Sequence, residues 1–352
     1  MKITVVIPIY NSERYVDVLL NQLVEQSYKD FEVIMINDGS TDKSGDICRK
    51  YQSQDIRFRY YEYANEGVSS TRNKGIALAK GEYIIFFDAD DRIDNDILYN
   101  LNKIACRTDA DMIVFGYYME LLKNERIVQK TVFTSENSTL IYKNDVAAMF
   151  MPWQNSLMYN VWNRMIKTNV IKNNSVQFDV NLSMGEDLDF ILDVLEVCNT
   201  IYISDKVMYH YIRERQGSAT SNTYISNWFE IRTEEKERLD SKFEKLGYYN
   251  VQYKNFLDKR YIERVIGCIE NEFKHKSVGH KDRYLAIKKM IKSNEVQNTL
   301  SNEEVVYNSS FIKIIVNNMR KKNYLTLYFI GYISYFVRKN FLRLFMYLKN
   351  NR

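Results

Sequence analysis

Three carboxylates crowd into four residues directly after an apolar run, in the segment FFDADD at positions 86–91. Like charges at this spacing repel one another, so the cluster is stabilised when a cation lies among them. Carboxylate oxygens are ligands that suit Mg²⁺ or Mn²⁺, and both cations also bridge diphosphate oxygens. The segment therefore predicts a divalent-metal site with Asp90 as its main protein ligand. The alternative is a solvated turn in which Asp91 or Asp94 caps the next helix.

Two further segments carry polar groups that could recognise a ligand. In INDGS at 36–40, Asp38 can accept a hydrogen bond from an imide N–H such as that of uracil, although a turn with a helix cap explains the same residues. In NEGVSSTRNKG at 65–75, the first glycine permits an unusual turn and Arg72 lies in the first turns of a helix, which gives an anion-facing surface. Arg72 could also pair with an aspartate such as Asp88, and the two roles are compatible.

The segment MGEDLDF at 184–190 begins an amphipathic helix with Glu186 and Asp187. Acidic residues complement the dipole at a helix N-terminus, and the same position would suit a general base for a hydroxyl group, so both interpretations stay open. His210 lies in an aromatic stretch, YHYIRERQGS at 209–218. It could complete a metal site, bind a phosphate, or be a structural histidine.

Alternating strands and helices must position these groups. Apolar, β-branched runs predict strands, and segments with helical spacing lie between them. The predicted strands are Ile3–Ile9, Phe31–Ile36, Phe58–Tyr63, Tyr83–Phe87 and Met112–Phe115, and the predicted helices are Glu13–Gln26, Asp42–Gln52, Ser69–Ala79 and Asp94–Ala105. This order indicates a mostly parallel sheet with helices on both faces. The strand ends would carry the polar segments to one edge, where α/β folds bind ligands.

The rest of the chain is organised differently. Residues 119–218 mix short strands and helices, and helical spacing dominates from 219, so we expect an α/β domain at 1–218 and a helical region at 219–352.

A hydrophobic share of 45% over 352 residues excludes a disordered or collagen-like chain. Neither GxGxxG after the first strand nor GxxxxGK[ST] nor GxSxG occurs, which argues against dinucleotide oxidoreductases, P-loop enzymes and α/β-hydrolases. The four cysteines form no CxxC pair, so free thiols in the cytoplasm are expected.

The tail at 311–352 is strongly basic. It holds nine Lys or Arg and no acid, and removing that +9 from the net charge of +4 leaves −5 on residues 1–310. Tyr324–Val337 is an uncharged, aromatic run of fourteen residues, shorter than the roughly 20 that cross a bilayer. It predicts peripheral attachment to an anionic membrane surface, at the inner face of the plasma membrane. The alternative is a helix that packs its aromatic stripe on the catalytic domain or on a second subunit.

Taken in this order, the motifs resemble those of glycosyltransferase family 2, the inverting enzymes with a GT-A fold. The matching segments are VVIPIYN (5–11) with Glu13, INDGSTD (36–42), NEGVSSTRNKG (65–75), FFDADD (86–91), MGED (184–187) and YHYIRERQGS (209–218). They cover about the first 220 residues, with 1–118 as the nucleotide-binding half and 119–218 as the acceptor half. The likeness is greatest to bacterial enzymes that build capsular polysaccharide, exopolysaccharide or teichoic acid.

The resemblance implies a UDP-sugar donor, a Mn²⁺ or Mg²⁺ cofactor, and transfer to a hydroxyl of a glycan or a lipid-linked acceptor. By its pattern Asp187 is the catalytic base with Glu186 in reserve, and the metal ligands are Asp90, Asp88 and His210. The residues implied in donor binding are Pro8, Tyr10, Asn11, Glu13, Asp38, Asn65, Gly67, Arg72, Asp88, Ala89, Arg213 and Ser218. A homo-oligomer is compatible with the sequence, and no nucleic-acid partner is expected.

Two other classes fit part of the pattern. A sugar nucleotidyltransferase also uses acidic metal sites on an α/β sheet, but the Gly-rich N-terminal loop with Lys or Arg that is usual in such enzymes is missing here. A non-catalytic nucleotide-sugar-binding or scaffold subunit would bind the donor without turnover. The intact acidic segments FFDADD and MGED argue against that class.

Overall fold

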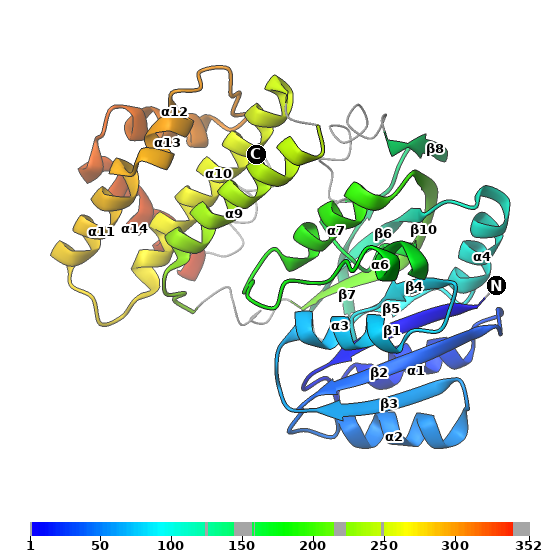
Figure 1. The fold of residues 1–352 in the computed structure, drawn as a ribbon. Coiled ribbons are helices and arrows are strands. Elements are labelled where there is room, and N and C mark those ends of the chain that lie inside the picture. Colours follow the sequence, from blue (N-terminus) through cyan, green and yellow to red (C-terminus); the bar gives the residue numbers. More distant parts are fainter. Residues whose placement is uncertain are drawn as a thin grey trace. The chain divides into compact units, whose positions relative to one another are not determined.

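The computed structural model describes residues 2–123, 126–143, 157, 159–214, 223–247 and 250–340. The chain divides into two compact units, Met1–Gln216 and Gly217–Arg352 (Figure 1). The first unit is built on one mixed sheet with helices, and the second is helical. The predicted fold class, a mostly parallel α/β sheet followed by a helical region, is therefore confirmed.

Four parallel strands form the first half of the sheet, in the order β3-β2-β1-β4. They are β1 (Ile3–Ile9), β2 (Phe31–Asp38), β3 (Phe58–Tyr63) and β4 (Tyr83–Phe86). Their connections contain α1 (Val16–Val24), α2 (Ser44–Gln54) and α3 (Val68–Leu78). β1 and β2 are buried along almost their whole length, because α3 covers one face of the sheet and α1 and α2 cover the other (Figure 1).

The second half of the sheet includes reversed strands. β9 (Arg164–Lys167) lies antiparallel between β4 and β6 (Met112–Lys123), and β6 pairs in parallel with β10 (Thr200–Glu214). The other antiparallel strands are β5 (Arg92–Ile93), β7 (Arg126–Phe133) and β8 (Thr139–Tyr142). The unit also contains α4 (Ile97–Thr108), α6 (Thr168–Asn173) and α7 (Glu186–Val197). Six of the ten strands in the described sheet share one direction, so it is mostly parallel.

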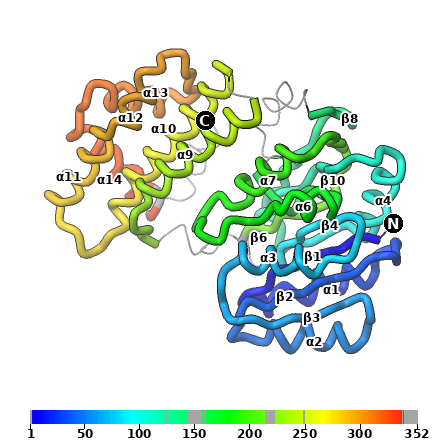
Figure 2. Tube along the Cα trace, in the orientation of Figure 1, coloured from blue at the N-terminus to red at the C-terminus, as the bar shows by residue number. Residues whose placement is uncertain are grey.

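The second unit consists of helices packed around one apolar core (Figure 2). Its described helices are α9 (Trp228–Lys245), α10 (Val251–Asn271), the short 3₁₀ helix η3 (Glu272–Lys274), α11 (His280–Lys292), α12 (Asn294–Leu300), α13 (Ser310–Arg320) and α14 (Tyr324–Asn340). The aromatic run predicted at Tyr324–Val337 lies in α14, and one side of α14 packs into this core through Leu327 and Tyr328. No helix in the described part of the chain combines the length and the apolar composition that crossing a bilayer requires.

α3 lies close to β1 because Gly75 has no side chain. A Cβ atom at this position would lie 2.3 Å from Cγ1 of Val6, a distance that real Cβ atoms essentially never show. Val6 is fully buried in the sheet, and closely packed interiors leave little room for it to move aside. The close packing of α3 on β1 matters for the site because Arg72 lies one turn earlier on the same face of α3.

We therefore expect Gly75→Ala to destabilise the protein by roughly 1–3 kcal/mol through overpacking. Gly267→Ala is the matched control, because Gly267 lies inside α10 and a Cβ built there meets no atom within 4 Å. Alanine at this exposed helical position should stabilise the protein by about 1 kcal/mol. Thermal unfolding followed by circular dichroism measures both changes. An unchanged midpoint for Gly75→Ala would contradict the packing argument.

Candidate functional site

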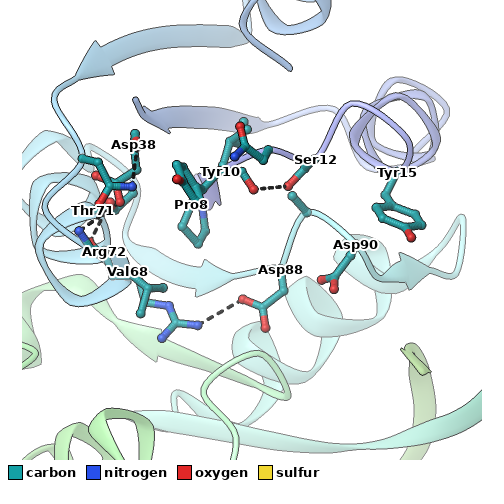
Figure 3. Close-up of a pocket in the computed structure, with 15 residues that line it drawn as sticks. Pro8, Tyr10, Ser12, Tyr15, Asp38, Val68, Thr71, Arg72, Asp88 and Asp90 are labelled. Atoms are coloured by element: carbon teal, nitrogen blue, oxygen red, sulfur yellow. Dashed lines mark hydrogen bonds and ion pairs between the residues drawn. The ribbon is translucent and has the colours of Figure 1, made fainter. Parts of the chain in front are cut away.

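A cavity of about 550 Å³ opens at the carboxyl ends of the parallel strands (Figure 3). Its walls come from the segments that follow β1, β2, β3 and β4, so the strand ends meet at one edge as predicted. Ten of the residues implied in donor or metal binding line this cavity: Pro8, Tyr10, Asn11, Asp38, Asn65, Gly67, Arg72, Asp88, Ala89 and Asp90. Ser12, Tyr15 and Thr71 line it too, although they were not among the residues predicted to bind the donor or the metal.

The loop after β1 is held by the loop that precedes α2. Asn11, whose φ is 46°, donates from its backbone N–H to Ser40 Oγ at 3.0 Å and accepts from the backbone N–H of Thr41 at 2.9 Å. Glu13 accepts a hydrogen bond from the backbone N–H of Lys43 at 3.0 Å. Glu13 thus braces the two loops, and it lies outside the lining of the cavity in which it was expected.

Asp38 fixes the loop that leads into α3. Its two carboxylate oxygens accept hydrogen bonds from the backbone N–H groups of Glu66 and Gly67, each at 2.9 Å, and the residue is 5% exposed. Gly67 has a φ of 89°, which other residues rarely adopt, so glycine is needed for the loop to turn here. Each carboxylate oxygen has a second lone pair, so this bracing is compatible with the predicted contact to a uracil imide.

Arg72 joins two acidic segments that lie far apart in the sequence. Its guanidinium lies 3.0 Å from Asp88 Oδ1 and 2.6 Å from Asp187 Oδ1. Glu186 Oε1 is 4.0 Å away, and the ring centroid of Phe178 is 5.3 Å from the guanidinium carbon. The Arg72 side chain is only 4% exposed. One buried cation thus holds the FFDADD loop against the start of α7.

Two carboxyl groups of the site, those of Asp187 and Asp90, have raised pKa values. Burial raises the pKa of Asp187 to about 6, against the lowering effect of Arg72 and with smaller raising effects from Asp88 and Glu186. Burial and the charge of Asp88 raise the pKa of Asp90. A carboxyl group with a pKa near 6 is ionised at neutral pH and is basic enough to accept a proton there. The raised pKa of Asp187 is therefore compatible with the proton-accepting role predicted for it.

Asp88 and Asp90 fit a divalent cation held by few protein ligands. Among the described residues, the Asp90 carboxylate accepts a hydrogen bond only from its own backbone N–H, so no cation of the protein neutralises it. Figure 3 shows Asp88 and Asp90 next to each other on the loop after β4. Within the described ranges, no group of three or more His, Cys, Asp or Glu side chains forms a preformed metal cluster. Magnesium commonly binds through one or two carboxylates and completes its shell with phosphate and water.

Asp91, the third carboxylate of the cluster, is structural. It is 2% exposed, and its oxygens accept hydrogen bonds from Tyr209 Oη at 2.6 Å and from the backbone N–H of Ile212 at 2.8 Å, both on β10. The alternative that Asp91 or Asp94 caps the next helix is wrong, because the N-cap of α4 is Asp96, which makes no side-chain cap hydrogen bond. The sequence offered no signal for Tyr209 beyond its position beside His210.

The structure does not bring His210 to the predicted metal carboxylates. Its Nδ1 lies 2.8 Å from Glu120 Oε1, and its Nε2 lies 2.9 Å from Asp94 Oδ1. Burial lowers the pKa of His210, but the hydrogen bonds and charges of these two carboxylates outweigh burial and raise it. Both ring nitrogens are engaged, so His210 acts here as a structural clamp on β10.

The other predicted residues of the 209–218 segment are also separate from the cavity lining. Arg213 is exposed, and its guanidinium carbon lies 5.8 Å from the ring centroid of Tyr211. It is not among the residues that line the cavity. Ser218 lies outside the described residues. Their roles in donor binding remain predictions.

Comparisons with known proteins agree with the motifs. Residues 4–173 match the family model described as glycosyl transferase family 2. The glycosyltransferase GlyA of Streptococcus pneumoniae is 28% identical over 253 residues, and the uncharacterised glycosyltransferase EpsJ of Bacillus subtilis is 26% identical over 249 residues. Each alignment covers 70% of this chain, together with 35% of GlyA and 70% of EpsJ. The chain therefore spans about a third of the length of GlyA.

A solved structure shows the same fold. Residues 1–349 of TarS from Staphylococcus aureus, in complex with UDP-GlcNAc, superpose with a TM-score of 0.65 at 22% identity. The match covers 95% of this chain and 91% of that one. At this identity the likeness concerns the fold and leaves the ligands of this chain to be tested.

We expect Arg72→Met to destabilise the protein by about 3 kcal/mol near neutral pH, because it leaves the partly buried carboxylates of Asp88 and Asp187 without their cation. Arg72 lowers the pKa of Asp187, so its loss should raise that pKa further above 6. When the pKa of a carboxyl group is higher in the folded state than in the unfolded state, its contribution to stability is fully present below the unfolded-state pKa. That contribution is lost as the pH rises through the folded-state pKa. The deficit should therefore be smaller at pH 5 than at pH 8.

Urea unfolding of the two proteins across this pH range measures the deficit. Arg72→Lys is the control, because it keeps the charge while changing the geometry. A deficit of equal size at all pH values would show that the Arg72 side chain acts through packing alone.

Proposed function

The chain belongs to glycosyltransferase family 2 through residues 4–173, and we propose that it is an inverting enzyme that uses a UDP-sugar donor. The sugar would pass to a hydroxyl group of a glycan or of a lipid-linked acceptor in bacterial surface polysaccharide synthesis. The observation that carries this proposal is the cavity lined by Arg72 and Asp88, together with the contact of the same Arg72 guanidinium with Asp187, which lies outside the lining.

The shape of the cavity suits a nucleoside diphosphate. Its volume of about 550 Å³ lies in the range of small-molecule sites. Figure 3 shows Asp38 and Asp90 on opposite sides, with Pro8 and Asp88 between them. We place the uracil near Asp38 and the diphosphate near Asp90. The side chains of Pro8 and Tyr10 would then contact the base and ribose.

Asp88 and Asp90 would hold Mg²⁺ or Mn²⁺ at the diphosphate end. The cation would stabilise the charge that develops on the UDP leaving group. Arg72 fixes the orientation of Asp88 through the contact of 3.0 Å. The carboxylate of Asp90 is the group of this cavity whose charge the described residues leave uncompensated.

Asp187 would remove the proton from the acceptor hydroxyl. Its pKa of about 6 makes it a carboxylate at neutral pH that is more basic than an ordinary aspartate. Oδ1 is held by Arg72 at 2.6 Å, whereas the only contact of Oδ2 with the described residues is a long one of 3.5 Å from the backbone N–H of Val161. We therefore assign the proton-accepting role to Oδ2. Direct attack of the activated hydroxyl on the sugar, opposite the leaving UDP, inverts the anomeric configuration.

The type of sugar is proposed from the relatives. TarS is described as a poly(ribitol-phosphate) β-N-acetylglucosaminyltransferase, and its solved structure contains UDP-GlcNAc. A hexose or an N-acetylhexosamine is accordingly the first choice of donor. A panel of UDP-sugars, assayed with Mn²⁺ for hydrolysis and transfer, tests this proposal. Tight UDP binding without turnover of any donor would instead support a non-catalytic binding subunit, and sugar-nucleotide formation would indicate a nucleotidyltransferase.

Activity should require a divalent cation, with Asp90 as the main protein ligand. We expect Asp90→Asn to abolish nearly all transfer and to weaken UDP binding mainly when metal is present, because the amide removes the charge that attracts the cation. Calorimetry of UDP binding with and without Mn²⁺ separates the metal effect from a folding defect. Full activity in excess EDTA would disprove the metal requirement.

Asp187→Asn should keep its affinity for UDP and lose turnover by roughly 10²–10⁴-fold, because the amide cannot take a proton. In the unmodified enzyme, kcat should fall as the pH drops below about 6, where the Asp187 carboxylate becomes protonated. Glu186→Gln is the matched control. A larger loss for Glu186→Gln would exchange the two assignments, and a product with retained anomeric configuration by NMR would exclude the inverting mechanism.

A further inference from the structure

α14 carries a row of large, partly exposed apolar side chains along one side, and Tyr332 at the edge of this row also contacts the core, with its ring centroid 5.9 Å from that of Phe273. Five residues make up this surface, which we call the outer face of α14. They are between 45% and 59% exposed: Leu325, Phe329, Tyr332, Ile333 and Phe336. At 100° per residue their spacing confines them to an arc of roughly 100°. Leu327 on the opposite side of the helix and Tyr328 beside the edge of the arc are buried in the core.

Positive charges lie at both ends of the outer face. Lys321 and Lys322 are exposed directly before the helix begins, and Lys339 is exposed in its last turn. The sequence has no Asp or Glu after Glu304, whereas residues 305–352 contain nine Lys or Arg. No acidic side chain in this part of the sequence is therefore available to pair with these lysines.

The positions of the lysines favour an anionic lipid surface over a second copy of the chain as the partner that covers the outer face of α14. A second copy of this face would bring lysines of both copies close together, and like charges at an interface are unfavourable. An anionic lipid surface is complementary to the same lysines, which contribute about 1 kcal/mol each near the headgroups. Tyrosine and phenylalanine side chains are also well suited to the boundary between headgroups and acyl chains.

The length of α14 determines how it would meet a bilayer. Its 17 described residues span about 25 Å, less than the hydrocarbon thickness of about 30 Å, and it is not a spanning candidate. An amphipathic helix of this kind lies in the plane of the interface with its apolar side inserted. The buried side of α14 stays in the core of the helical unit, so only the outer face is available for insertion.

We propose that the outer face of α14 docks on an anionic lipid surface, with Phe329 and Ile333 inserted and the lysines at the headgroups. This interaction goes beyond sugar transfer and does not depend on it. It would hold the enzyme at the surface where a lipid-linked acceptor is found. It also narrows the attachment expected from the basic, aromatic tail at 311–352 to one face of α14.

Co-sedimentation of the full chain with vesicles tests the proposal. We use phosphatidylcholine vesicles with and without phosphatidylglycerol, each at low and high salt. The chain should bind only the vesicles with phosphatidylglycerol, and binding should weaken at high salt. The variants Phe329→Glu/Ile333→Glu and Lys321→Glu/Lys322→Glu should each lower the partition coefficient by at least about tenfold.

Matched controls carry equivalent changes on the α/β unit. Ile56→Glu/Val180→Glu alters two side chains that are 97% and 58% exposed, and Lys29→Glu/Lys103→Glu changes the net charge by the same amount as the lysine variant of α14. Both controls should sediment like the unmodified chain. Equal loss in the controls and the α14 variants, or binding that is independent of phosphatidylglycerol, would overturn the proposal.

A second measurement does not depend on destabilising substitutions. Ile333→Cys can carry an environment-sensitive dye in a Cys106→Ser background, because Cys106 is the exposed thiol and Cys48, Cys198 and Cys268 are buried. A blue shift of the dye with phosphatidylglycerol vesicles supports insertion. A blue shift that instead follows protein concentration without lipid, together with dimers in analytical ultracentrifugation, would assign the face to a second copy and overturn the lipid proposal.

Discussion

The site depends on one buried positive charge. Asp88, Glu186 and Asp187 come from two distant segments, and their carboxylates approach the same guanidinium, that of Arg72. Carboxylates brought this close would repel each other strongly at low solvent exposure. Burying an ion pair carries a desolvation penalty that often cancels its attraction, so the main effect of Arg72 is to fix positions. The arrangement of these carboxylates follows from where the backbone places this one side chain.

Several local features place Arg72. Gly75 lets α3 lie against β1, and the pair of backbone hydrogen bonds to Asp38 sets the point at which α3 begins. On the opposite side, Tyr209 and the backbone of Ile212 hold Asp91 and thereby the loop that carries Asp88. The Arg72 guanidinium and its carboxylate partners thus meet because separate contacts fix the position of α3 and, through β10, the position of the loop after β4.

The fold and the cavity could be predicted where the signal is local. β1 and β3 have the predicted bounds. β1 is a continuous apolar run, and β3 is a short segment rich in aromatic residues, and both patterns indicate strands directly. The strand-end residues gather as expected, because parallel strands bring their carboxyl ends to one edge.

The roles of His210, Asp91 and Glu13 could not be predicted, because their partners lie 30 to 118 positions away in the sequence. These partners are Glu120, Tyr209 and Lys43, and only the register of the folded sheet brings Glu120 and Tyr209 into place. The sequence of an acidic cluster does not show which aspartate binds a cation and which accepts a structural hydrogen bond from a tyrosine. The packing of α14 could not be predicted either, because the spacing of apolar residues shows that a helix has an apolar face but not which helix that face contacts.

Burial also sets the pKa of the proposed base. Burial raises the pKa of Asp187, while Arg72 lowers it enough for the group to be ionised at neutral pH. A fully solvated aspartate would be too weak a base, and a buried aspartate without Arg72 would stay protonated, so the pair is what makes Asp187 suitable for general base catalysis near neutral pH.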